Sequence, residues 1–362
     1  IPDDPCKRDY GFDVHVGCDD ACQGNFRAWL RERYPAFAEA KRPAAEPGDP
    51  RDVFVSPFPS ECHQSTYIAR QAEAFVRGQA GPEPWFAFCS FVAPHHPFEA
   101  PADQIARYDG LDIPLPSAAT VTGIPEPAAG AIGETAHFSE AAMRRVVLHY
   151  LASISLVDDN VGRLLQALED TGQMENTVIV FVADHAEFLG NRGLLRKPSI
   201  HVDELIRVPL LLRLPGATAA GRRVNGMVEL VDVYPTLLGL LGIPVNPGVQ
   251  GMDWSGALRD GSAIAREDIY ADMFNMHPLV SGSTFGPFMA IQTLRTDDWK
   301  LNVYPTAGPE YGQLFNLRDD PGERTNLYAD PAHRDTREAM LWRLLQRVHR
   351  NIDPLPLRLT QW

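Results

Sequence analysis

A run of apolar residues in the middle of the chain ends abruptly in polar side chains. Residues 177–183 read Thr-Val-Ile-Val-Phe-Val-Ala, and Asp184 and His185 follow at once. β-Branched and aromatic residues without a polar break are typical of a strand buried on both faces, as in parallel sheets. The pattern therefore predicts a buried strand that presents Asp184 and His185 at its carboxyl end, where open α/β sheets gather ligands.

A second apolar run, residues 85–92, predicts another buried strand, which leads into Pro94, His95, His96 and Pro97. Between the two runs, residues 139–170 carry apolar side chains at helical spacing and predict a long amphipathic helix. The order strand, helix, strand is the βαβ pattern of a parallel sheet. We therefore expect an α/β fold with a mostly parallel sheet flanked by helices.

The sequence pattern changes near residue 265, where predicted short strands and turns replace the longer apolar runs. We predict two domains: an α/β domain over residues 1–264, and a smaller C-terminal α+β domain over residues 265–362, made of an antiparallel sheet and a helix. The remaining predicted elements are helices at 25–34, 65–78, 229–241 and 335–352, strands at 208–214, 269–273, 289–295 and 300–304, and a loop at 99–133.

Composition narrows the classes of partner. The chain has 362 residues, 44% of them hydrophobic, and a formal net charge of −14. Phosphate-bearing partners demand a basic surface, so we expect neither nucleic acid nor an anionic membrane as a partner. No apolar segment approaches the roughly 20 residues that span a bilayer. A small anionic molecule stays compatible with this charge if a few cations converge in one pocket, and a homo-oligomer is left open.

The five cysteines, an odd set without paired zinc-type spacing, favour free thiols over a disulfide scaffold. They are Cys6, Cys18, Cys22, Cys62 and Cys89. The chain opens with Ile1 rather than Met, which is typical of a piece of a longer protein, so targeting cannot be judged from it. The compartment is left open between cytoplasm and periplasm, with the cytoplasm favoured.

Several residues near the predicted strand ends could carry chemistry. Asp184 and His185 combine a hard oxygen and a borderline nitrogen, which suit a divalent cation, although an Asp that caps a turn beside a structural histidine is equally expected from the dipeptide alone. Lys197 could balance an anion or be a solvated surface lysine. His95 could reach the same sheet edge or satisfy loop carbonyls, and for His201 a functional and a structural role are equally open.

One acidic pair has a simpler interpretation. Asp203 and Glu204 are spaced from Arg207 for ion pairs within a helix, so we predict a structural role for all three.

The segment 184–197, Asp-His-Ala-Glu-Phe-Leu-Gly-Asn-Arg-Gly-Leu-Leu-Arg-Lys, followed by His-Val-Asp-Glu-Leu-Ile-Arg-Val-Pro-Leu at 201–210, resembles the central signature of the type I sulfatase family. That family belongs to the alkaline-phosphatase-like superfamily. Further similar motifs occur in the family's order at residues 11–13, 91–98, 157–162, 231–238 and 314–327.

The resemblance implies a fold and a set of roles. It implies an alkaline-phosphatase-like fold and a hydrolase of sulfuric esters. Asp184 and His185 match two ligands of one divalent cation, usually calcium. Lys197 and His95 match cationic residues that grip the sulfate, and His201 falls where the family lines the substrate pocket. Ala186 departs from the glycine that is usual in the family.

The family's nucleophile motif is absent from this chain. In the family, Cys or Ser in Cys/Ser-x-Pro-x-Arg is converted to formylglycine, and no Cys or Ser here is followed by that Pro and Arg. The matches begin at residues 11–13, which lie after this motif in the family. We therefore expect an N-terminal truncation that removed the formylglycine segment and half of the metal site. The parent would hydrolyse a small-molecule sulfate ester, whereas the chain itself would bind metal weakly and be inactive.

Two other hypotheses are kept beside this one. A phosphonate or phosphate monoester hydrolase of the same superfamily would share these positions, and a non-catalytic sulfatase-like binding protein would have lost the nucleophile. The particular sulfate ester cannot be read from the sequence.

Overall fold

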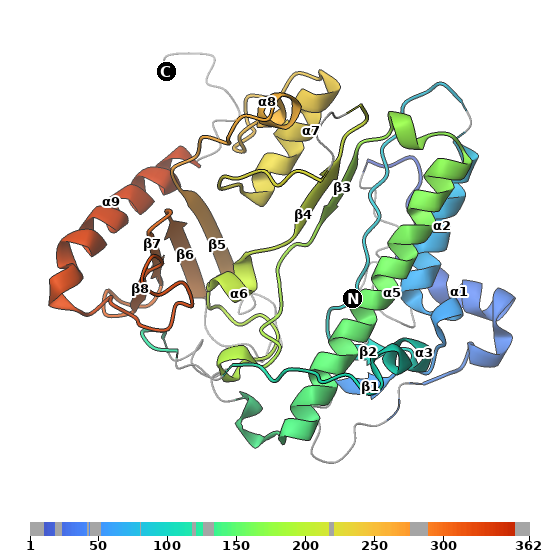
Figure 1. Cartoon of the computed structure of the whole chain (residues 1–362), viewed down its shortest axis with the longest axis horizontal. Helices are drawn as coiled ribbons and strands as arrows, with labels where there is room; N and C mark the ends of the chain where they lie inside the picture. The colour runs from blue at the N-terminus through green and yellow to red at the C-terminus, as the bar shows by residue number, and fades with distance from the viewer. Residues whose placement is uncertain are drawn as a thin grey trace, which may run out of the picture. The chain divides into compact units, whose positions relative to one another are not determined.

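The computed structural model of the chain divides into two compact units (Figure 1). Unit 1 comprises Ile1–Pro116 and Thr135–Val178, and unit 2 comprises Ser117–Glu134 and Ile179–Trp362. A domain boundary at residue 264 stays a prediction. The residues that the structure describes are 11–18, 24–41, 43, 52–79, 81–117, 121–125, 134–216, 221–275 and 289–351.

Unit 1 is organised around the long helix α5, Glu140–Asp170. The Ser139 side chain caps it by accepting the N–H of Ala142, which satisfies one of the open donors of the first turn. The apolar face of α5 packs against α2, Gln64–Gly78. The buried Asn160 of α5 joins the two helices through a 3.2 Å hydrogen bond to the Thr66 hydroxyl of α2.

The rest of unit 1 is small elements around these helices. β1, Val53–Val55, pairs in parallel with β2, Phe98–Ala100. The helices α1, Gly24–Arg33, and α3, Ala102–Ile105, complete the unit. An aromatic-rich core lies beneath α1 and α2 and consists of Phe26, Leu30, Phe58, Cys62 and Tyr67.

The predicted strand at residues 85–92 is wrong. The segment forms no strand ladder among the described residues, and Phe86 and Phe88 are 64% and 74% exposed. An apolar run favours an extended backbone, but a strand exists only where a neighbour supplies hydrogen-bond partners. The predicted βαβ unit is therefore not formed. The parallel pair β1–β2 was not predicted, because β2 overlaps the start of the segment that was predicted to be a loop, residues 99–133.

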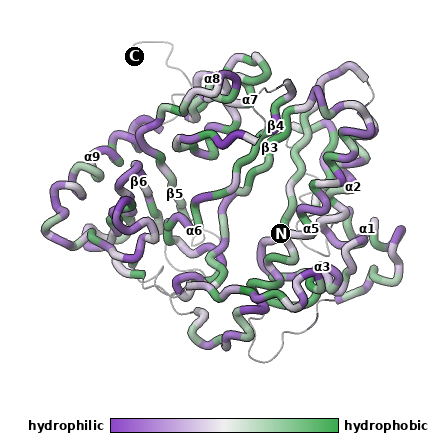
Figure 2. The backbone as a smooth tube through the Cα atoms, viewed as in Figure 1, coloured by the Kyte–Doolittle hydropathy of each residue, from purple (hydrophilic) through white to green (hydrophobic). Residues whose placement is uncertain are grey.

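In unit 2, β3 spans Ile179–Val182 and pairs antiparallel with β4, Leu210–Arg213. The apolar run was thus a strand, but burial on both faces is wrong, because Phe181 and Val182 are each 41% exposed. Within the described residues β4 is the one strand that pairs with β3, so the faces of this two-stranded ribbon are covered only in part. Figure 2 shows hydrophobic residues running along both strands.

The antiparallel sheet and the terminal helix predicted near the C-terminus are both present. Helix α9, Arg334–Arg350, packs on the sheet through Met340 and Leu344, which meet Leu294, Leu301 and Leu314. The strands, each paired antiparallel with the next, are β5, Ile269–Asn275, β6, Met289–Arg295, β7, Trp299–Val303, and β8, Gly312–Asn316.

Among the described residues of unit 2, the remaining α-helices are α6, Asp203–Ile206, α7, Val233–Leu241, and α8, Ser255–Asp260. The combination of helices and sheets with a C-terminal antiparallel sheet confirms the α/β class. Of the helices in the described part of the chain, none combines the length and apolarity needed to cross a bilayer.

Three of the five cysteines, Cys18, Cys62 and Cys89, lie in the described residues, and Cys62 and Cys89 are free thiols. Burial raises the pKa of the Cys62 and Cys89 thiols to about 11, which keeps them protonated and unreactive near neutral pH. The other two, Cys6 and Cys22, lie outside the described residues.

Candidate functional site

The loop after β3 brings together three of the predicted site residues. The Nζ atom of Lys197 lies 2.8 Å from Nε2 of His185. The other ring nitrogen of His185, Nδ1, lies 2.8 Å from the carbonyl oxygen of Ala186. A carbonyl oxygen only accepts, so Nδ1 carries the proton and Nε2 keeps its lone pair for the Lys197 ammonium. The ring is thereby held in the tautomer that a metal ligand or hydrogen-bond acceptor requires.

Asp184 is the third member of this group. Its Oδ1 accepts the backbone N–H of His185 at 2.9 Å, and its Oδ2 lies 3.5 Å from His185 Nε2. The Asp184 side chain is 86% exposed, so it keeps most of its hydration and can turn toward a ligand at little cost. A carboxylate, an imidazole and an ammonium therefore meet around one accessible point on the surface of unit 2.

Glu187 ties the two ends of the loop that presents Lys197. Its Oε1 accepts the backbone N–H groups of Leu189 and of Arg196, the residue before Lys197. Burial raises the pKa of Glu187, and these hydrogen bonds partly offset that rise. Glu187 lay within the family-like segment but received no role from the sequence. The sequence feature that could have indicated a role for Glu187 is its position as an acidic residue inside a glycine-flanked loop.

The loop backbone is unusual in its conformation. Leu189, Arg192 and Arg196 have φ values of 53°, 58° and 61°, in the left-handed region that costs non-glycine residues on the order of 1–3 kcal/mol each. Residues keep such a backbone conformation only where the contacts around them hold it in place. Buried side chains supply this restraint here, because Phe188 and Leu194 are both fully buried in a core that includes Ile291 of β6.

His201 lies in the same unit but is buried rather than displayed. It is 4% exposed, and its Nδ1 lies 2.8 Å from the Thr293 hydroxyl of β6. Its carbonyl accepts the side-chain amide of Asn302 at 2.7 Å. Burial lowers the pKa of His201 to about 3, so the ring is neutral at physiological pH. A role for His201 in binding substrate stays a prediction.

His95 belongs to unit 1, and its grouping with the residues of unit 2 stays a prediction. The side chain is exposed, its Nδ1 lies 2.6 Å from the His96 carbonyl, and its ring stacks on His96 with the centroids 4.1 Å apart. Nδ1 therefore donates to a carbonyl, as in His185, and Nε2 is the lone-pair nitrogen. The placement of His95 at the end of a buried strand was wrong, because residues 85–92 form no strand among the described residues.

A divalent cation fits the donor chemistry of Asp184 and His185 but not their number. Calcium takes 6–8 oxygen-rich ligands, and among the described residues no group of three or more His, Cys, Asp or Glu side chains could hold a metal ion. A role for Asp184 and His185 as metal ligands therefore stays a prediction.

Two family models match overlapping parts of the chain. The family model "Sulfatase" matches residues 14–243, and the model "N-sulphoglucosamine sulphohydrolase, C-terminal" matches residues 190–350. The chain is 29% identical to the multifunctional alkaline phosphatase superfamily protein PehA of Trinickia caryophylli, over 80% of this chain and 61% of PehA. It is 26% identical to an arylsulfatase of Clostridium perfringens, over 75% of this chain and 54% of that protein.

Among solved structures, the phosphonate monoester hydrolase of Agrobacterium radiobacter superimposes with a TM-score of 0.75 at 24% identity, covering 93% of this chain and 71% of that chain. At that identity the likeness shows the fold alone. This chain spans about three fifths or less of the length of the curated relatives named above. Since the "Sulfatase" model covers more than half of the residues, the chain belongs to the sulfatase family.

Proposed function

We propose that the whole protein hydrolyses sulfate esters of small molecules, and that this chain carries part of its active site. The observation that carries the proposal is the contact of Lys197 with His185 beside Asp184, in the segment that resembles the sulfatase signature. A fixed ammonium beside an accessible carboxylate and imidazole suits a tetrahedral anion whose charge grows during ester cleavage.

In this proposal Lys197 binds a sulfate oxygen and stabilises the charge that develops on the ester as the bond breaks. His95 is proposed to assist it from unit 1, and His201 to support the pocket from beneath. Asp184 and His185 would supply two of the ligands of a divalent ion, with calcium favoured, and the other ligands would come from outside the described residues. Such an ion, when bound, polarises a sulfate oxygen.

Steady-state kinetics of the whole protein on 4-nitrophenyl sulfate test the proposal. We expect turnover in the wild type and a loss of about 100-fold in kcat/KM for Lys197→Met, the size typical of removing one donor to a developing charge. The matched control is Arg318→Gln, which removes an exposed cation that pairs with Asp298 elsewhere in unit 2. A wild type that turns over no sulfate ester, or a Lys197→Met variant as active as the control, would count against the proposal.

A phosphonate monoester hydrolase is the second candidate, because two solved proteins of that description share this fold with TM-scores of 0.75 and 0.73. Sulfate and phosphonate esters present similar tetrahedral centres, so the residues seen here serve either. The same assay with 4-nitrophenyl phenylphosphonate separates the two: we expect kcat/KM for the sulfate ester to be the higher, and the reverse order would favour this candidate.

A further inference from the structure

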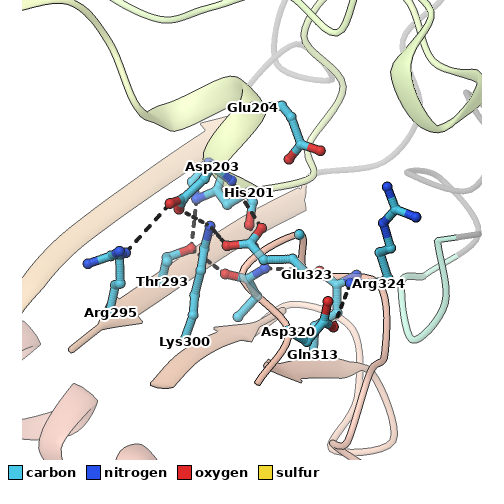
Figure 3. Close-up of polar contacts among 12 residues, drawn as sticks. His201, Asp203, Glu204, Thr293, Arg295, Lys300, Gln313, Asp320, Glu323 and Arg324 are labelled. Carbon is cyan, nitrogen blue, oxygen red and sulfur yellow. Dashed lines mark hydrogen bonds and ion pairs between the residues drawn. The ribbon is translucent and has the colours of Figure 1, made fainter. Parts of the chain in front are cut away.

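A buried carboxylate of the C-terminal region contacts the start of α6. Glu323 follows β8, is 1% exposed and has a φ of 50°. Its Oε2 accepts the backbone N–H of Asp203 at 3.0 Å, and its Oε1 accepts a hydrogen bond from Nζ of Lys300 at 2.8 Å. Figure 3 shows Lys300 extending from β7 to place its ammonium between the carboxylates of Asp203 and Glu323.

The charges of this cluster balance. Lys300 is fully buried, and its Nζ also lies 3.0 Å from Oδ1 of Asp203, whose other oxygen lies 3.7 Å from Nε of Arg295. Two cations therefore face two carboxylates. Burial raises the pKa of Glu323, and although burial acts in the same direction on Asp203, Lys300 and Arg295 together hold the pKa of Asp203 below its ordinary value. Buried ions at such distances are tolerated only as a paired set, so removing one member leaves an uncompensated charge.

The same turn also contacts the loop that carries the candidate site. The buried Arg192 donates to the carbonyl oxygens of Gly322 and Glu323 at 2.7 and 2.8 Å, and it pairs with the carboxylate of Glu204. Lys197 lies in the sequence between Arg192 and Asp203. The turn therefore holds the segment on both sides of Lys197.

We propose that Glu323 and Lys300 are positioning residues: they hold residues 187–203 on the C-terminal sheet and so fix Lys197 against His185. The effect of this restraint on catalysis rests on the proposed function, whereas the restraint of the loop itself does not. The three left-handed residues of the loop need external restraint, and this turn supplies it through one charged cluster and two backbone carbonyls.

Hydrogen exchange measured by mass spectrometry tests the restraint directly. In the wild type we expect peptides covering residues 187–196 to exchange slowly, because the N–H groups of Phe188 and Gly190 donate to the carbonyl oxygens of Arg196 and Leu194 across the loop. For Glu323→Gln we expect exchange in these peptides to rise about tenfold more than in peptides from β6 and β7, which matches the loss of a charged hydrogen bond. The double variant Lys300→Met/Glu323→Gln restores the charge balance and should exchange more slowly than either single variant.

The control variant is Asp298→Asn, which removes an exposed partner of Arg318 in the same region and should change loop exchange less than about twofold. Equal rises in the loop and in β6 and β7, or no rise in the loop, would overturn the inference, since the pair would then stabilise unit 2 as a whole or nothing at all.

Kinetics of the whole protein supply the second readout. Glu323→Gln should lower kcat/KM for the sulfate ester about tenfold, whereas Asp298→Asn should leave it unchanged. Full activity in Glu323→Gln despite a loosened loop would overturn the positioning role. If the wild type hydrolyses no ester, the proposed function fails, and the exchange data still decide whether the turn restrains the loop.

Discussion

Nζ of Lys197 and Nε2 of His185 lie 2.8 Å apart, with the imidazole proton held on Nδ1 by the Ala186 carbonyl. The contact with His185 thus fixes the position of the Lys197 ammonium. This contact depends on a loop whose shape is set by Glu187 within it and by Arg192 against the C-terminal turn.

The position of the charge on residue 197 should matter as much as its presence. Lys197→Arg keeps the charge but replaces a compact ammonium with a longer planar fork, which cannot occupy the same point beside His185. We expect a loss of at least about tenfold in kcat/KM of the whole protein on a sulfate ester, with unchanged thermal stability because the side chain is exposed. An arginine variant with wild-type kinetics would show that only the net charge is used.

Metal affinity should depend on Asp184. In the whole protein we expect Asp184→Asn to weaken calcium binding at least about tenfold in isothermal titration calorimetry, because an anionic oxygen ligand is lost. The Asp184 side chain is exposed, so the fold should be unaffected. Calcium should also raise the melting temperature of the wild type, and EDTA should reverse that rise. Equal calcium affinities in variant and wild type would remove Asp184 from the ligand set.

Buried neutral histidines should make the protein less stable in mild acid. Burial lowers the pKa of His63 to about 4 from the ordinary 6.5, with Asp103 opposing it. Above pH 6.5 His63 is unprotonated in both the folded and the unfolded chain, and its contribution to the free energy of unfolding is fully present. Below this pH the unfolded chain is protonated first, so the free energy of unfolding falls by up to about 1.4 kcal/mol per pH unit until about pH 4.

His63→Asn isolates this contribution. His63 caps α2 by accepting the Ser65 N–H at 3.1 Å, and asparagine is a preferred cap residue without a titrating ring. Urea unfolding at pH 7.5 and pH 5 should show a smaller loss of stability for the variant than for the wild type. His201, whose pKa is lowered to about 3, keeps part of the slope in both proteins. Identical losses in the two proteins would contradict the assignment.

The buried guanidinium of Arg192 should contribute strongly to stability. Its side chain is 3% exposed and its partners are Glu204 and two backbone carbonyls. We expect Arg192→Met to lower the free energy of unfolding by about 2–3 kcal/mol, since charged hydrogen bonds are lost and two carbonyls are left without this donor. Arg318→Gln, which removes an exposed pair, should cost less than about 0.5 kcal/mol under the same urea denaturation.

The amphipathic helix at residues 139–170 could be predicted almost to the residue, because its signals are local: the 3.6-residue apolar spacing and a serine cap. The strand predicted at residues 85–92 could not be judged in the same way. An extended apolar segment becomes a strand only when a distant segment pairs with it, and no residue within the run specifies that partner.

The partners of the acidic pair Asp203 and Glu204 could not be predicted from the sequence either, because they lie outside the helix that contains the pair. Asp203 and Glu204 were predicted to be structural, which agrees with their contacts, but the partner Arg207 was wrong. Asp203 pairs with Lys300 and Arg295, and Glu204 pairs with Arg192. Helical spacing favours a neighbour on the surface, whereas a buried cation brought in by another strand offers a stronger contact in a less polar environment.

The sequence by itself determined the family and the candidate site residues: an acid, imidazoles and an ammonium, in motifs similar to those of the sulfatases. It also determined most of the helices, since their signals are short-range. Tertiary structure alone decided that Lys197 meets His185, that His201 is buried against Thr293, and that Lys300 lies between the carboxylates of Asp203 and Glu323. The contacts of His201 and Lys300 join residues far apart in the chain, and their energy comes from burial and pairing, which local sequence patterns do not encode.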